Sequence, residues 1–188
     1  MNYARNAWYV ASWAQDVLDE KLSAMTILDE PIVLFRREYG QVAALDDRCV
    51  HRHAPLSLGR CEGRNLRCMY HGLLYSPTGQ VIEIPGQEKI PGHAKVRSYP
   101  KAKKHSWVWM DDPKKADESF IPDAVGLDDP GYILGHGQLD YQAEARLIND
   151  NLLDFSHLSC VHADSFQASP DYVSSPAKIQ RVDRGISY

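Results

Sequence analysis

Residues 48–72 read RCVHRHAPLSLGRCEGRNLRCMYHG, and this stretch contains two cysteine–histidine pairs. Cys49 and His51 form a C-x-H pair, and Cys68 and His71 form a C-x-x-H pair, with sixteen residues between the two pairs. Each pair is expected at a junction between a strand and a loop, so that two short loops approach one another. One thiolate and one imidazole from each loop suit a [2Fe–2S] cluster with thiolates on one iron and imidazoles on the other. The spacing therefore predicts that Cys49 and Cys68 bind one iron and that His51 and His71 bind the second.

A zinc site is the alternative for these four ligands. Zinc modules also use two cysteines and two histidines, but they normally pair Cys with Cys and His with His. Here each loop supplies one of each, which favours the iron–sulfur cluster, and a non-catalytic zinc module stays open as an alternative. Cys61 and Cys160 receive no role, because a free cysteine is most often a small buried hydrophobic residue.

The N-terminal part of the chain has the pattern of short antiparallel strands. Apolar and β-branched runs are separated by turn residues, which is typical of a β-meander. These runs and turns are 26–28, 29–31, 32–35, 38–40 and 42–45. A later hairpin is expected from residues 72–75 and 80–82 around the turn 76–79, and Ser106–Met110 alternates like a half-buried strand. This part is therefore expected to be mainly β.

The character of the sequence changes after residue 110. Residues 111–131 are rich in Asp, Pro and Gly, which indicates a connector. Beyond it, residues 132–134 resemble a strand, and Ala143–His157 is the segment with good helical character. We therefore expect a cluster domain over 1–112, a connector over 113–131 and a second domain over 132–188.

The composition is that of an ordinary globular protein, with 44% hydrophobic residues, 24% charged residues and a formal net charge of −4. No apolar run approaches the roughly 20 residues of a membrane helix. The N-terminus lacks a basic start followed by an apolar stretch, so we expect no membrane span, no export signal and a cytoplasmic location. The 21 Lys and Arg do not exceed the 25 Asp and Glu, so nucleic acid is not an expected partner.

A second group of candidate ligands lies at residues 150–162, which read DNLLDFSHLSCVH. On a regular helix Asp150, Asp154 and His157 fall at i, i+4 and i+7, so they share one face. His162 is five residues from His157, about 140 degrees round a helix. The two imidazoles can therefore meet at one metal only if the helix bends or ends between them. Solvated acids and ordinary histidines are the alternative interpretation of these side chains.

Three segments together resemble a known family. The loops at 48–57 and 66–72 resemble the cluster loops of the Rieske non-haem iron oxygenases, and 150–162 resembles their iron-binding segment. The opening RNAWYVA at 5–11 is similar to the start of the vanillate O-demethylase and dicamba monooxygenase branch. Met69 departs from the family, where proline is common; it removes no ligand but leaves the loop less rigid.

The resemblance implies a fold and a set of site residues. It implies a mainly β Rieske domain, with antiparallel strands and a two-loop cluster-binding subdomain, followed by the start of an α+β helix-grip catalytic domain. His157 and His162 would be two ligands of a mononuclear Fe(II) with open positions for dioxygen. Asp154 would be catalytic as a bridge between His157 and a Rieske histidine, His71 of a neighbouring subunit, which implies a homotrimer.

The resemblance also implies an activity. Electrons from NAD(P)H would pass through a flavin and iron–sulfur reductase to the cluster, and then to the iron, which would activate O2 to monooxygenate or O-demethylate a small aromatic substrate. In the family the third iron ligand lies well downstream, and Asp164 is a poor substitute because it is only two residues from His162. We therefore expect the 188-residue chain to be the N-terminal part of a longer oxygenase and to be inactive alone. A Rieske ferredoxin-like electron carrier without oxygenase activity is the alternative.

Overall fold

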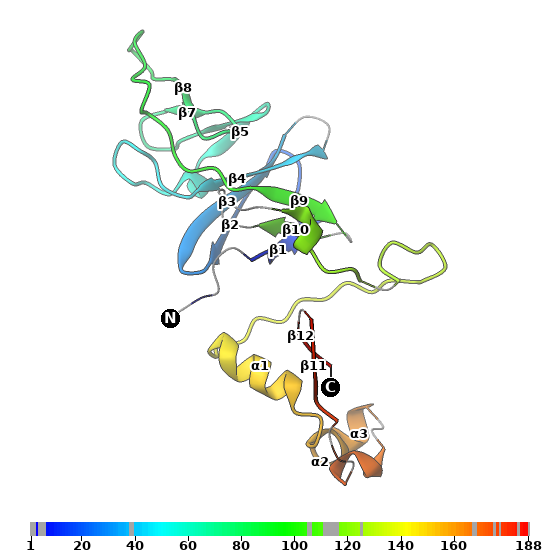
Figure 1. Ribbon diagram of the computed structural model, residues 1–188. Coiled ribbons are helices and arrows are strands. Elements are labelled where there is room, and N and C mark those ends of the chain that lie inside the picture. Colours follow the sequence, from blue (N-terminus) through cyan, green and yellow to red (C-terminus); the bar gives the residue numbers. More distant parts are fainter. Residues whose placement is uncertain are drawn as a thin grey trace. The chain divides into compact units, whose positions relative to one another are not determined.

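The computed structural model describes most of the chain in two units, Met1–Leu134 and Gly135–Tyr188 (Figure 1). The described residues are 3, 7–37, 40–104, 107–110, 117–124, 126–166, 169–174, 176, 178–183 and 185–187. The predictions made for residues 5, 6, 38, 39, 106 and 111–116 lie outside them.

The centre of the first unit is an antiparallel meander. It consists of β2 (Leu22–Ile27), β3 (Glu30–Arg36) and β4 (Val42–Asp46), as the alternation of apolar runs and turns predicts. Successive side chains of a strand face opposite sides of the sheet. In β3, Val33 and Phe35 face one hydrophobic core, whereas Ile32 and Leu34 face another. This sheet is therefore covered on both faces, which explains its continuous apolar sequence.

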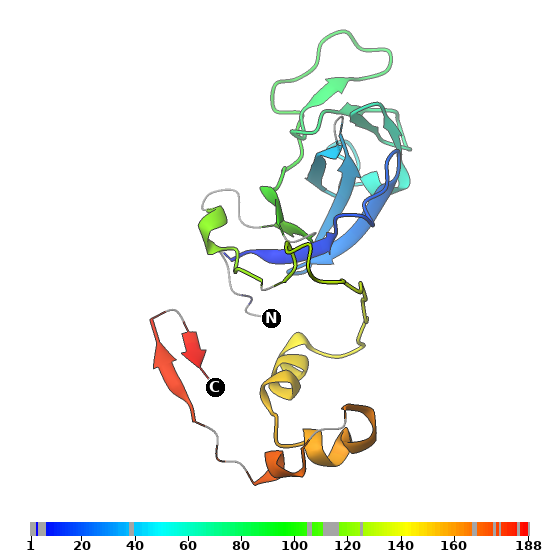
Figure 2. The same ribbon diagram turned by 90° about the vertical axis from the view of Figure 1, so that its right-hand side faces the viewer.

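A second, four-stranded sheet lies at one end of the first unit (Figures 1 and 2). Its order is β5 (Arg60–Glu62), β6 (Asn65–Arg67), β7 (Leu74–Tyr75) and β8 (Val81–Glu83), and it follows the short 3-10 helix η2 (Leu56–Leu58). The predicted hairpin is confirmed by the pairing of β7 with β8. Leu66 and Tyr75 of this sheet are fully buried in the same core as Val33 and Phe35.

A third sheet completes the first unit, with the strand order β1 (Tyr9–Trp13), β10 (Trp107–Met110) and β9 (Lys101–Lys104). It is tied to the meander because the amide of Asp46 donates to the Arg97 carbonyl at 2.9 Å and the amide of Tyr99 donates to Ala44 at 3.0 Å. The 3-10 helix η3 (Glu118–Phe120) lies next to it, since the Trp8 indole donates to the Asp117 carbonyl at 2.7 Å.

The second unit is mainly helical in its first half. It contains α1 (Ala145–Leu153), α2 (Leu158–Val161), α3 (Ala163–Phe166), the 3-10 helix η4 (Pro170–Val173) and the hairpin β11 (Gln180–Val182) and β12 (Gly185–Ser187). None of its described side chains is fully buried. Within the described part of the chain, every helix is too short or too polar to cross a membrane.

Two local predictions are wrong. Residues 132–134 form no strand, and Ile133 is wholly exposed, so an apolar triplet alone was insufficient evidence for sheet pairing. The helix predicted to reach His157 ends at Leu153, because Asp154 adopts an extended conformation and its carboxylate accepts from the Ser156 amide at 2.9 Å. Such a local side-chain bond competes with helix continuation. The expected fold class was a mainly β first domain followed by the start of an α+β one, and it is confirmed by the antiparallel sheets of the first unit and the helical start of the second.

Candidate metal centres

The first candidate loop begins immediately after β4. The Cys49 amide donates to the Ala54 carbonyl at 2.9 Å, and the His53 amide donates back to the Cys49 carbonyl at 2.8 Å. Asp47 closes the base of the loop, because its carboxylate accepts from both the amide and the hydroxyl of Ser57 at 2.6 Å each. The loop is therefore a closed turn that directs Cys49 into the core and leaves His51 exposed.

The second loop follows β6 and is closed in a similar way. The Cys68 amide donates to the Leu73 carbonyl at 2.9 Å. Gly72 has a φ of +73°, a conformation that glycine adopts without strain, and a Cβ there would lie 3.0 Å from the ring of Pro85. Arg67 links the end of this loop to the neighbouring strands. Its guanidinium donates to the Gly72 carbonyl at 2.8 Å and to the carboxylates of Glu62 and Glu83.

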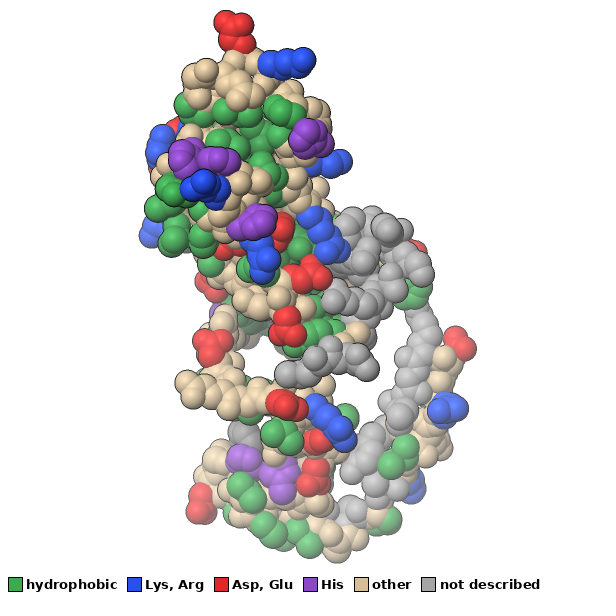
Figure 3. Space-filling view, turned by 90° about the vertical axis from the view of Figure 1, so that its left-hand side faces the viewer, with side chains coloured by type: hydrophobic (Ala, Val, Ile, Leu, Met, Phe, Trp, Pro, Cys, Tyr) green, Lys and Arg blue, Asp and Glu red, His purple; other side chains and the backbone are tan. Residues whose placement is uncertain are grey.

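The structure brings the four predicted ligands together in two pairs, one of histidines and one of cysteines. The Nδ1 atoms of His51 and His71 lie 3.1 Å apart, and the two exposed rings meet edge to face. Cys49 is near enough to Cys68 to raise the pKa of its thiol, and both residues are almost completely buried. The arrangement thus has a buried thiol end and an exposed imidazole end. Figure 3 shows histidine side chains on the surface of the first unit, beside cationic and hydrophobic ones.

This donor set fits a metal centre. With metal–imidazole bonds of about 2.1 Å, two nitrogens on one ion at 90–109 degrees lie about 3.0–3.4 Å apart, which includes the observed separation. Burial raises the pKa of the Cys68 thiol, the amides of Tyr70 and His71 donate to its sulfur and lower that pKa, and the adjacent Cys49 raises it again. The pKa of Cys68 is raised overall, so its thiolate requires stabilisation by a bound cation, and the two amides directed at the sulfur add to it.

Tyr75 is a contact of the site that the sequence did not predict. Its hydroxyl is 3.1 Å from the Cys49 sulfur and accepts from the Val50 amide, also at 3.1 Å. When Cys49 binds a metal as a thiolate it has no hydrogen to donate, so the hydroxyl would then be the donor of this bond. Burial raises the pKa of Tyr75, which keeps the donor protonated. The available signal was a strand tyrosine beside the second loop, since a buried tyrosine needs a partner for its hydroxyl.

The second candidate centre lies at the two ends of α2 in the second unit. His157 and His162 flank α2, and their ring centroids are 5.4 Å apart. The predicted common helix face of Asp150, Asp154 and His157 is wrong, because α1 ends at Leu153. A helix end does lie between the two histidines, because α2 ends at Val161, one residue before His162, and this is what their approach requires.

Both imidazoles of this second pair have polar groups near Nδ1. His157 Nδ1 is 3.8 Å from an oxygen of Asp154 and is itself buried without a hydrogen bond, whereas His162 Nδ1 contacts the Ser165 hydroxyl at 3.2 Å. Hydrogen bonds from Ser156 lower the pKa of Asp154, so this carboxylate stays ionised. Among the residues that the structure describes, no group of three or more His, Cys, Asp or Glu side chains is arranged around one ion. Asp164 therefore joins no such group.

Comparison with known families identifies the domain that contains the first centre. Residues 7–100 match the model of the Rieske [2Fe-2S] domain. This chain belongs to the Rieske family. Residues 141–188 match the vanillate O-demethylase oxygenase C-terminal domain, so the Rieske domain is followed by a segment typical of the oxygenase branch.

Relatives of this Rieske chain include several oxygenase components. It is 46% identical over 162 residues to the iron-sulfur subunit of a toluene-4-sulfonate monooxygenase system from Comamonas testosteroni, covering 85% of this chain and 47% of that protein. It is 41% identical over 172 residues to the oxygenase component of dicamba O-demethylase from Stenotrophomonas maltophilia, covering 89% and 50%. The crystal structure of dicamba monooxygenase bound to 3,6-dichlorosalicylic acid superposes with a TM-score of 0.87 at 37% identity, covering 99% of this chain and 55% of that one. The Rieske chain thus spans about half the length of the curated relatives it matches.

Proposed function

We propose that Cys49, Cys68, His51 and His71 hold a Rieske [2Fe–2S] cluster that serves a terminal oxygenase. The observation that carries the proposal is the 3.1 Å separation of the two Nδ1 atoms above a pair of buried thiols. A structural zinc site does not require two buried thiols and two exposed imidazoles. An electron-transfer cluster does need one exposed edge, through which the electron passes to a partner. When bound, the cluster supplies one-electron transfer, and a mononuclear Fe(II) supplies the activation of dioxygen.

In this proposal the two ends of the Rieske site have different roles. Cys49 and Cys68 hold the buried iron and keep water from it, while neighbouring amides and Tyr75 stabilise negative charge on sulfur. Because Nδ1 of each histidine faces the shared centre, Nε2 of His51 and His71 is on the outer side of the ring, where it can face a partner. In this proposal the electron leaves the cluster through these imidazoles.

We further propose that His157 and His162 are two protein ligands of the mononuclear iron. Asp154 lies on the Nδ1 side of His157 at 3.8 Å, and the Ser165 hydroxyl contacts Nδ1 of His162, so Nε2 of each ring is left for the metal. By similarity to the family, Asp154 also links His157 to His71 of a neighbouring subunit in a homotrimer. The carboxylate would fix the tautomer of both imidazoles.

The proposed partners follow from the same role. Oxygenase components of this kind receive electrons from NAD(P)H through a separate flavin and iron–sulfur reductase. Residues 48–98, which hold the cluster loops, contain eight Lys and Arg but three Asp and Glu, although the whole chain has a net charge of −4. This local positive charge favours a reductase with an acidic docking surface. We propose a small aromatic substrate that is monooxygenated or O-demethylated.

The test is iron analysis combined with oxygen uptake in the complete oxygenase. We expect one iron per chain more than the two of the cluster, and reductase-dependent oxygen consumption with an aromatic substrate. His157→Ala and His162→Ala should each remove the additional iron and oxygen uptake but leave the visible spectrum of the cluster intact. A wild-type protein with cluster iron alone and no oxygen uptake would support the electron-carrier alternative instead.

A further inference from the structure

A hollow in the first unit lies away from the cluster loops, between the β3–β4 connection and β9. Its volume is about 440 Å³, which is in the range of small-ligand pockets. Three of its lining side chains are cationic, and none of the described lining residues is acidic. The lining consists of Arg37, Gly40, Gln41, Val42, Lys101, Ala102 and Lys103.

The two neighbouring arginines of this region differ in their hydrogen bonding. The Arg36 guanidinium is satisfied by the carbonyls of Ala14, Val17 and Gly40. Arg37 Nε is also buried, but it has no hydrogen-bond partner among the described residues. A buried donor on a charged group is costly to leave unpaired, so the position calls for an acceptor that the described chain does not supply.

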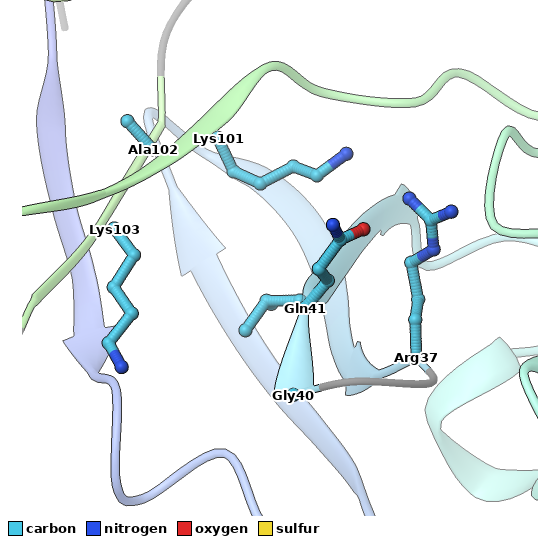
Figure 4. Close-up of a pocket in the computed structure, with 7 residues that line it drawn as sticks. Arg37, Gly40, Gln41, Lys101, Ala102 and Lys103 are labelled. Atoms are coloured by element: carbon cyan, nitrogen blue, oxygen red, sulfur yellow. The ribbon is translucent and has the colours of Figure 1, made fainter.

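Lys101 adds a second cation to the same part of the hollow. Burial lowers the pKa of Lys101, and the nearby positive charge of Arg37 lowers it further. No ion pair to Arg37 or Lys101 is found within the described ranges. In Figure 4 the ends of Lys101, Gln41 and Arg37 point to the same side of the pocket, whereas Lys103 points the other way. Within the described part of the chain these two neighbouring cations thus have no counter-ion, an arrangement that an anion would stabilise.

We propose that Arg37, Gln41 and Lys101 form a binding site for a small oxyanion: a carboxylate, sulfonate or phosphate. A guanidinium presents a planar fork of N–H donors to two oxygens, an ammonium adds three donors, and the Gln41 amide adds a neutral one. These groups match the oxygens of all three anions. The site is on the Rieske domain but uses none of the proposed cluster ligands. Failure of the anion site would therefore leave the proposed electron transfer unaffected, and the reverse also holds.

The experiment is calorimetric titration of the cluster-loaded full chain with sodium phosphate and, separately, with sodium benzoate, at fixed ionic strength set by chloride. Thermal unfolding with and without each anion is the second readout, because a ligand that binds only the native state raises the midpoint. The variants are Arg37→Gln and Lys101→Met. The matched control is Lys103→Met, which removes the same charge from the pocket wall but from a side chain that points away.

We expect at least one anion to bind, with affinity weakened about tenfold or more in Arg37→Gln and Lys101→Met because each loses a charge-assisted contact. Lys103→Met should stay within about twofold of wild type. Lys101→Met should also raise the unfolding midpoint without anion, since it relieves the repulsion from Arg37. Absence of binding by both anions, or an equal loss in Lys103→Met, would overturn the site. A preference for benzoate indicates a planar carboxylate, and a preference for phosphate a tetrahedral anion.

Discussion

The Tyr75 hydroxyl and the Cys49 sulfur form a hydrogen bond of 3.1 Å inside the core of the Rieske domain, and the hydroxyl is its donor when Cys49 is a thiolate ligand. A hydrogen bond to a ligand sulfur stabilises the more negative, reduced cluster. Tyr75→Phe should therefore lower the midpoint potential, by roughly 40–60 mV if the bond contributes about 1–1.5 kcal/mol. Redox titration followed by absorbance measures the shift. Tyr99→Phe is the control, because its buried hydroxyl donates to Glu30 instead; an equal shift in both variants would argue against a specific effect.

Asp47 should determine how firmly the first loop is held. Asp47→Ala leaves the Ser57 amide without its acceptor, so we expect a loss of about 2–3 kcal/mol in the free energy of unfolding. Ser57→Ala keeps the amide bond and should cost about 1 kcal/mol. Denaturant unfolding, monitored by cluster absorbance and circular dichroism, compares them. Equal stability of Asp47→Ala and wild type would show that the Asp47–Ser57 contact does not stabilise the loop.

Arg67 should confer acid sensitivity on the second loop. Its hydrogen bonds lower the pKa of Glu62 and of Glu83 in the folded protein. Stability from these carboxylates is present above their unfolded pKa of about 4.3 and is lost as the pH falls through the lower folded values. Below about pH 4.3, the free energy of unfolding should therefore fall more steeply in wild type than in Arg67→Met. Arg60→Met, which removes a partner of Glu62 alone, should be intermediate; identical slopes in all three proteins would contradict this role.

Asp154 should affect transfer between the two metal sites without affecting the cluster. In the complete oxygenase, Asp154→Asn should slow turnover about 10- to 100-fold, as loss of an orienting partner of a ligand histidine does, while the visible spectrum is unchanged. The control is Asp150→Asn, because Asp150 lies on an exposed face of α1 near Arg146. Rapid-mixing measurement of cluster reoxidation distinguishes them, and normal reoxidation in Asp154→Asn would discredit the bridging role.

The sequence predicted those parts of the molecule that depend on local pattern. The apolar runs at 26–28, 32–35 and 42–45, separated by turn residues, predicted the meander, because each run is long enough for one buried strand. The two cysteine–histidine pairs predicted which side chains would meet. Their roles as ligands, and those of His157 and His162, remain proposals.

The parts that the sequence did not predict depend on competition or on distant contacts. The helix ends at Leu153 because the Asp154 carboxylate bonds Ser156, a choice between two local bonds of similar strength. The partner of the Tyr75 hydroxyl lies across the core, on the first loop. Likewise, Arg37 and Lys101 become neighbours only through packing of distant strands.

The most direct test of the central claim is magnetic resonance of the reduced, purified chain grown with 15N-histidine or with natural histidine. We predict two irons and two acid-labile sulfides per chain in a reddish-brown protein, with couplings from two histidine nitrogens that change on labelling. His51→Ala and His71→Ala should each abolish that signal. A colourless protein containing only zinc, or a cluster without coupled histidine nitrogens, would contradict the account.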